Sequence, residues 1–470
     1  MELHRNINHI RAIGSPADTA KEVRTGLLID KHLNAVISGD KLLHAHYLFL
    51  KRLLPPFDDV IPRIPVYQIT SPMLALMGPK QLQRQVTAAL GQFDEEAKSD
   101  AIAILGGALR PLEPQQRQDL VTAALGLVDE EEKAGAIAGL GAGLAALEPL
   151  QQQALVTAAL GLVDEENKAA AIAGLAAGLA ELEPQQQQDL VTAALGLVDE
   201  EDQARAIAGL GTALAPLEPL QQQALVTAAL GMVPNGPKAT AIAGLGAGLA
   251  SLEPQQRKEL VTAALGLVDG MHKARAIAGL GAGLASLEPL QRKDLVTAAL
   301  GLVDGMHEFQ AIAGLGAGLA SLEPLQRKEL VTAALGLVDE WQKARAIDGL
   351  GAGLASLKLL QQQQLVTAAL GLVDEEYKAE AIAGLGAGLA ALEPQQQQEL
   401  VKAALGLEFG FNKAQAIAGL GAGLASPESP QQQALITAAL DLKREDEKAQ
   451  AIAGLVNGYQ ASRVRGYLAE

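Results

Sequence analysis

The sequence predicts an all-α protein: a right-handed superhelical α-solenoid of eleven two-helix repeats with a helical N-terminal cap. The first observation behind this prediction is a 35-residue unit that recurs in tandem from Met77 to Ala461 without a slip in its period. Fixed-period self-similarity in this range is typical of solenoids, in which each unit buries its apolar face against its neighbours. The second observation is that apolar residues make up 49% of the chain but aromatic residues only 3%. Ala, Gly and Leu therefore supply the hydrophobicity, which favours closely packed helices over a sheet or a deep pocket.

The chain divides into three parts in sequence order. Residues 1–76 contain two predicted helices, around Pro16 to Ile37 and Asp40 to Leu54, and then a proline-rich connection. We interpret this segment as a cap that shields the first repeat, because a finite array needs ends that do not expose its core. The repeat array occupies residues 77–461, and a short tail occupies residues 462–470.

One clean copy, residues 252–286, shows how each unit is expected to fold. A first helix is predicted from about Pro254 to Leu265, because proline suits the first turn of a helix. Gly266 then stands where a left-handed C-cap is expected. Asp269 is the candidate N-cap of a second helix that covers roughly Gly270 to Ala285.

In most units three glycines fall inside the predicted second helix, at positions 28, 30 and 32 counted from the opening leucine. Each costs about 1 kcal/mol relative to alanine in a helix interior. We expect the compensation to be a close approach of neighbouring second helices, below the usual separation of roughly 8–10 Å. The alternative is that recent duplication copied a tolerated sequence many times.

The charge distribution argues against nucleic acid and anionic membranes as partners. The chain has a formal net charge of −17, and the acidity belongs to the repeats because residues 1–76 are nearly balanced. A field of this sign repels phosphate at long range. No apolar run reaches the roughly 20 residues of a membrane span, and no signal peptide opens the chain. We therefore expect no membrane insertion and a soluble protein, cytoplasmic or exported by a route without a conventional signal peptide.

Patterns that would indicate catalysis are weak. The chain has no cysteine, which excludes disulfides, thiolate chemistry and Cys-ligated zinc. His44 and His46 are the nearest approach to a ligand pair, but they fall in a predicted helix. No Gly-rich phosphate loop or Ser/His/Asp set emerges. We therefore expect a non-enzymatic protein with no cofactor, no metal and no small-molecule substrate.

The helix–turn–helix unit resembles the HEAT, armadillo and tetratricopeptide repeats, over about four-fifths of the chain. It lacks the aromatic pattern of the tetratricopeptide family and the third helix of armadillo. The resemblance implies a scaffold that binds a protein partner. The near-identical copies, rich in Ala, Gly, Leu and Gln, also resemble repeat-built effectors that host-associated bacteria deliver into eukaryotic cells. That resemblance implies a secreted virulence protein with a host protein as its partner.

A nucleic-acid-binding helical repeat protein is the alternative. Pentatricopeptide repeats have the same length, and Leu252–Gln256 resembles the Leu-Thr-Pro-x-Gln opening of transcription-activator-like effector repeats. However, acidic residues such as Asp129–Glu131 usually stand where those effectors carry their base-reading loop. Carboxylates there would oppose phosphate contact, so nucleic acid is disfavoured as a partner.

Departures from the repeat consensus mark a candidate binding surface. Position 20 is glutamate in the first four units but becomes methionine or an aromatic residue in several later ones, and further bulky residues join it nearby. The predicted partner-binding residues are Met271, Met306, Phe309, Trp341, Tyr377, Phe409 and Phe411. Because equivalent positions stack along a solenoid, we expect a row on one rim. Such residues dominate interface hot spots, and the alternative for each is packing beneath the turn.

A second location for a partner is the concave side of the array. Position 24 of the second helix varies between units, for example as Arg205, Thr240, Arg345 and Glu380, while its neighbours on that face are small. If an extended peptide lies along the concave side, these residues would select it. Free variation at a solvated site is the alternative.

Overall fold

The computed structural model describes residues 79–233, 235–423, 429–444, 447–448 and 450–455. The predicted cap at 1–76 and the predicted tail at 462–470 lie outside the described residues. Every regular element within the described ranges is helical, and the helices follow one another in pairs. The all-α repeat solenoid that the sequence predicts is therefore confirmed as an architecture. The count of eleven units and the right-handed sense stay predictions.

The first helix begins at a proline in every unit except one, in which α21 begins at Leu359. These helices are α5 (Pro79–Leu90), α7 (Pro114–Leu125), α9 (Pro149–Gly161), α11 (Pro184–Leu195), α13 (Pro219–Gly231), α15 (Pro254–Gly266), α17 (Pro289–Leu300), α19 (Pro324–Gly336), α21 (Leu359–Gly371), α23 (Pro394–Gly406) and α25 (Pro430–Asp441). Proline fits there because its missing N–H has no intrahelical partner at the first turn.

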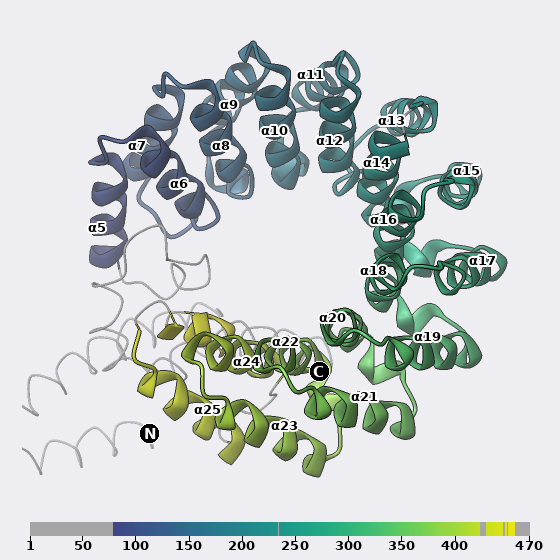
Figure 1. Cartoon of the computed structure of the whole chain (residues 1–470). Coiled ribbons are helices and arrows are strands. Elements are labelled where there is room, and N and C mark those ends of the chain that lie inside the picture. Colours follow the sequence, from purple (N-terminus) through teal and green to yellow (C-terminus); the bar gives the residue numbers. More distant parts are fainter. Residues whose placement is uncertain (1–78, 234, 424–428, 445–446, 449, 456–470) are drawn as a thin grey trace, which may run out of the picture.

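The second helices begin one residue after an aspartate in most units. They are α6 (Glu95–Gly106), α8 (Glu130–Gly141), α10 (Glu165–Leu175), α12 (Glu200–Gly211), α14 (Asn235–Ala247), α16 (Gly270–Leu280), α18 (Gly305–Gly316), α20 (Glu340–Gly351), α22 (Glu375–Gly386) and α24 (Gly410–Gly423). The array curls into an open ring in which the second helices line the inner side and the first helices form the outer side (Figure 1).

The glycines of the second helix stand where neighbouring helices touch. A Cβ atom on Gly139 would lie 2.2 Å from the Cα of Ala103, and one on Gly141 would lie 2.1 Å from the carbonyl oxygen of Gly174. Real Cβ atoms do not approach backbone so closely, so only glycine permits this packing. The prediction that glycine allows close approach of neighbouring second helices is confirmed.

The apolar core runs continuously along the array between the two helix layers. In the unit at 252–286, Leu260, Ile277, Leu280 and Leu284 have no exposed surface. Each unit thus contributes the same small set of leucine, isoleucine and alanine side chains, and the neighbouring unit covers them.

Two local expectations are wrong. Gly266 is the last residue of α15 and not a left-handed cap, because the chain passes directly into extended backbone at Leu267 (φ −62°, ψ 134°). The second helix also ends earlier than expected, at Leu280, and the chain continues to Ser286 as the 3₁₀ helix η6 (Gly281–Ser286). The tighter turn lets Leu284 reach the core, where it is fully buried.

None of the helices in the described part of the chain is long and apolar enough to cross a membrane.

Candidate interaction rim

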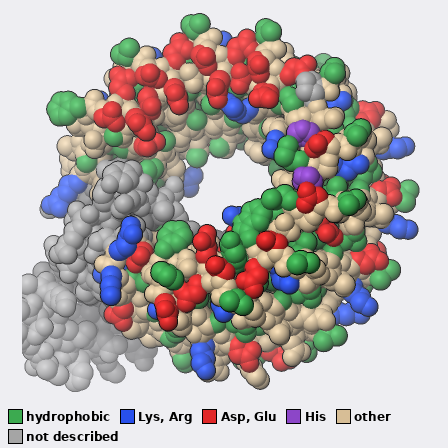
Figure 2. Space-filling model, viewed as in Figure 1, with side chains coloured by type: hydrophobic (Ala, Val, Ile, Leu, Met, Phe, Trp, Pro, Cys, Tyr) green, Lys and Arg blue, Asp and Glu red, His purple; other side chains and the backbone are tan. Residues whose placement is uncertain are grey.

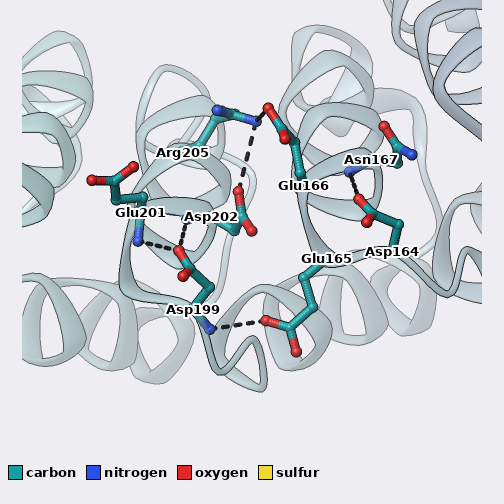
Figure 3. Close-up of polar contacts among 8 residues, drawn as sticks. All are labelled: Asp164, Glu165, Glu166, Asn167, Asp199, Glu201, Asp202 and Arg205. Carbon is teal, nitrogen blue, oxygen red and sulfur yellow. Dashed lines mark hydrogen bonds and ion pairs between the residues drawn. The ribbon is translucent and has the colours of Figure 1, made fainter.

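The turns that join the first and second helices of each unit form one rim of the array, which we call the turn rim (positions 17–21 of each unit). Aspartate at position 18 caps the second helix in most units. Asp164 Oδ1 accepts a hydrogen bond from the Asn167 N–H at 3.0 Å, and Asp199 Oδ1 accepts one from the Glu201 N–H at 2.8 Å (Figure 3). The predicted N-cap is confirmed, and it holds position 20 at the surface.

Glutamate at position 19 connects each unit to the next. The Glu165 carboxylate accepts hydrogen bonds from the N–H groups of Val198 and Asp199, at 2.8 and 2.9 Å. Figure 3 shows the bond from Asp199. We call such a pair of N–H groups, at positions 17 and 18, an amide socket. In the described residues the socket is filled in this way by Glu95, Glu130, Glu165, Glu340 and Glu375. The acidic turns therefore have a structural role that their sequence did not reveal.

The rim of the early units is strongly acidic. Residues 112–216 contain 17 Asp or Glu but only four Lys or Arg, and their carboxylates gather at the turns of α8, α10 and α12 (Figure 2). A hollow of about 760 Å³ opens there among Glu130, Asp164, Glu166 and Asp202. Burial raises the pKa of Asp202, and Arg205 opposes this from 3.7 Å. This part of the rim would repel an acidic partner.

The rim of the middle units lacks this acidity. Residues 217–321 are as long as the acidic stretch but contain eight Asp or Glu and seven Lys or Arg. Position 19 becomes Asn235, Gly270 and Gly305, so no glutamate reaches the next socket. Within the described ranges, no hydrogen bond involves the N–H groups of those three sockets, which are Val268 with Asp269, Val303 with Asp304, and Val338 with Asp339.

The predicted partner-binding residues separate into two kinds. Met271 and Met306 are 42% and 44% exposed, and Phe409 and Phe411 are 67% and 57% exposed. These four side chains are open to a partner.

The other three predicted residues are only partly accessible. Phe309 and Tyr377 pack against the core. Trp341 is half-buried and meets Phe309 edge to face, with ring centroids 4.9 Å apart. The rings of two neighbouring units thus support one another.

Sequence reasoning missed the valine at position 17. It recurs as Val128, Val163, Val198, Val233, Val268, Val303, Val338 and Val373, and each side chain is between 83% and 102% exposed. The signal was present, since an apolar residue is retained beside a polar cap in unit after unit. Leucine at position 16, by contrast, is buried, as Leu162 and Leu267 show at 3% exposure.

On the inner face, the junction between α20 and α22 carries three charged residues, and one of them, Asp348, stands where the other units have alanine. Arg345 Nε lies 2.7 Å from Glu380 Oε1 on the next unit, so two of the variable position-24 residues bind one another. Burial raises the pKa of both Asp348 and Glu380, and Arg345 opposes the shift in each. In the described part of the chain, no group of His, Asp or Glu could hold a metal ion.

Comparison with known proteins shows helical repeat proteins as structural neighbours. No family model matches the chain, and no curated protein matches it in sequence. Among solved structures, a Kap121p mutant is similar over 99% of this chain and 57% of its own, with 13% identity and a TM-score of 0.40. Kap95p bound to RanGDP is similar over 83% of this chain and 58% of its own, with 16% identity and a TM-score of 0.35. The chain thus spans somewhat more than half of the length of these proteins. An engineered protein is similar over 81% of this chain and 99% of its own, with 18% identity and a TM-score of 0.23.

Proposed function

We propose that this protein is a non-enzymatic scaffold that binds a protein partner through the turn rim of its middle and late units. The observation that carries the proposal is the replacement of exposed glutamate at position 20 by Met271, Met306 and Trp341 on three consecutive units. An exposed position favours a charged side chain in a monomeric protein, and a continuous row of apolar ones is typical of an interface. The exposed Val268, Val303 and Val338 extend the same surface.

The chemistry of these side chains suits a protein partner. Methionine is flexible and polarisable, and tryptophan supplies a large rigid area, so both favour contact with an apolar surface. A nucleic acid is disfavoured because a polyanion that runs along several units would also lie against the strongly acidic units 112–216. Phe409 and Phe411 would form a second contact further along the rim.

The test is affinity capture with the full chain as bait, from lysates of the encoding organism and of candidate host cells. A photo-crosslinking residue at Met306 identifies what lies against the rim. A protein that cross-links at Met306, and is no longer captured by a Met306→Glu/Trp341→Glu/Phe411→Glu variant, supports the proposal. The control is Val163→Glu/Val198→Glu, which adds charge to rim sites in the acidic units that are more exposed than the three tested positions. Helical content of each variant is checked by circular dichroism.

Capture that is equal for wild type and the triple variant would place the partner elsewhere, on the inner face or on residues 1–76. Capture of nucleic acid alone, with retention on heparin, would favour a nucleic-acid-binding repeat protein instead. A host protein as the partner, and delivery by host-associated bacteria, form a separate part of the proposal. This part rests on the near-identity of the repeats and on their Ala-, Gly-, Leu- and Gln-rich composition. A translocation reporter fused to the chain tests it.

A further inference from the structure

The same backbone site occurs in two states along the array. In five junctions the amide socket holds a glutamate carboxylate from the preceding unit, with N···O distances of 2.8 to 3.3 Å. In three consecutive junctions, those preceded by Asn235, Gly270 and Gly305, the glutamate is missing. The open sockets coincide with the units that carry Met271, Met306 and Trp341 at position 20.

We propose that the three open sockets bind carboxylate side chains of the partner, which is an acidic and apolar protein segment. Its carboxylates would take the place of the glutamates that this chain lacks at these three junctions. The inference rests on the proposed function and specifies the partner's chemistry. The five filled sockets show the ligand that this arrangement of N–H groups accepts, because each of them holds a carboxylate.

The aspartate beside each socket does not prevent this binding. In four of the five filled sockets a glutamate carboxylate lies next to the position-18 aspartate, as Glu165 does beside Asp199. The aspartate does not repel the second carboxylate strongly, because its own carboxylate accepts hydrogen bonds from N–H groups of the helix that it caps. In the open units the same bonds form, with Asp269 Oδ1 accepting from the N–H groups of Met271 and His272 at 2.9 and 3.1 Å. These bonds lower the pKa of Asp269, the one from His272 most.

A hollow gives a ligand access to one open socket. About 700 Å³ of space is lined by Gly305, Val338, Asp339 and Tyr377, and also by the carboxylates of Glu308 and Glu340. A Cβ atom on Gly305 would lie 2.6 Å from Gln342 Oε1, and its three nearest atoms all belong to the flexible side chain of Gln342. That side chain can turn aside, so a carboxylate from outside can reach the N–H groups of Val338 and Asp339. Trp341 lies two residues after Asp339, in the first turn of α20, and offers apolar contact near the socket.

The spacing of the sockets fixes the pattern expected in the ligand. The close glycine contacts lie far along the second helices, so at the turns we take the ordinary helix spacing of roughly 8–10 Å for neighbouring sockets. An extended polyproline II segment rises about 3.1 Å per residue with three residues per turn. Carboxylates at every third residue therefore point to one side at about the spacing of successive sockets. Apolar residues between them would contact Met271, Met306 and Trp341.

The local charge permits an acidic ligand despite the net charge of −17. Residues 217–356, which contain all three open sockets, are nearly balanced, with 13 acidic and 11 basic residues. The acidic stretch ends at residue 216, so one full unit separates it from the unit that holds the first open socket, at Val268 and Asp269. The electrostatic screening length is about 8 Å at physiological ionic strength. The repulsion from the acidic units is therefore weak at the open sockets.

The experiment uses the full chain and a fluorescent peptide that repeats Glu-Leu-Pro, with peptides that repeat Gln-Leu-Pro and Lys-Leu-Pro for comparison. Binding is followed by fluorescence anisotropy at physiological salt. We expect the Glu peptide to bind at least about tenfold more tightly than the Gln peptide, because its contacts are charge-assisted. The Gly270→Glu/Gly305→Glu variant, which supplies its own carboxylates to two sockets, should lose that preference. The matched control Gly270→Ala/Gly305→Ala adds bulk without charge and should retain most of it.

Equal binding of the Glu and Gln peptides would overturn the sockets as carboxylate sites. If that binding were still lost in Trp341→Glu, the apolar scaffold of the proposed function would stand. No binding of any of the peptides would also overturn this inference, whereas the capture and cross-linking experiment would still test the proposed function. Preference for the Lys peptide would reverse the assignment and indicate a basic partner.

Discussion

Residues 112–216 and 217–321 are three units each, built on one scaffold, yet their rims differ. Both stretches have the same helix pairs and the same close glycine contacts, for example Gly174 against Ala138 and Gly279 against Ala243. Only the first has acidic turns whose glutamates fill the next socket. The comparison teaches that the buried repeat is constrained by packing, while the turn rim is free to vary. Function is therefore to be sought in the variation of the rim.

The largest effect should appear where the two stretches are the same. Gly174→Ala and Gly279→Ala each place a Cβ within 2.3 Å of a backbone Cα on the second helix of the preceding unit. We expect each to destabilise the array by about 2–3 kcal/mol, because the helices must move apart. Urea unfolding followed by circular dichroism measures the loss.

Gly161→Ala and Gly266→Ala are the matched controls, since no atom lies within 4 Å of the added Cβ at either site. These should be neutral or slightly stabilising, because alanine is the better helix former. Similar stability for Gly174→Ala and Gly161→Ala would contradict the packing role of the glycines.

Amide hydrogen exchange should separate the two rims directly. The Val198 and Asp199 N–H groups are bound by Glu165, whereas those of Val303 and Asp304 have no hydrogen bond within the described residues. We expect the first pair to exchange at least about tenfold more slowly, a difference of roughly 1.4 kcal/mol. Equal exchange rates would show that the glutamate bonds do not persist in solution. A peptide that fills the open sockets should slow the second pair.

The sequence was sufficient to predict the architecture because each unit repeats the same buried pattern. The period, the prolines at the first turn and the Asp269 cap all act locally, so one unit predicts the others. The role of the glycines was predictable for a similar reason, since a repeated penalty in a helix demands a repeated contact.

The details of the rim were harder to predict. The hydrogen bond from the Val198 N–H to Glu165 could not be predicted, because it joins two units and leaves no local pattern in the sequence. The sequence predicted a single exposed row of side chains. In the structure their exposure differs, because Phe309 and Trp341 pack against each other whereas Met306 is exposed. Side-chain direction at a turn depends on the neighbouring unit, which a pattern within one unit does not encode.

Substitutions that give each rim the position-19 chemistry of the other should change the free energy of unfolding in opposite directions. Glu165→Ala removes two hydrogen bonds to N–H groups and should destabilise the array by about 1 kcal/mol. Gly305→Glu should fill the socket at Val338 and Asp339 and recover part of this amount in the middle units. Thermal unfolding of each variant at matched pH provides the measurement, with Gly305→Ala as the control for bulk. A loss of stability in Gly305→Glu greater than in Gly305→Ala would show that the open socket does not accept a carboxylate.

The smallest effect concerns the inner face, where alanine at position 27 is common to both stretches but Asp348 replaces it in a later unit. Burial raises the pKa of Asp348 above 3.8, its value in a solvated chain. The folded state therefore holds the proton more tightly than the unfolded state, and the ionised carboxylate destabilises the fold at neutral pH. This cost disappears as the pH falls through the raised pKa. We expect Asp348→Ala to be more stable than wild type by about 0.5 kcal/mol at pH 7, with the difference shrinking toward pH 4. Asp348→Asn should behave similarly, because it also removes the charge. A pH-independent difference would mean that the size of the side chain, and not its ionisation, strains the contact with Gly384.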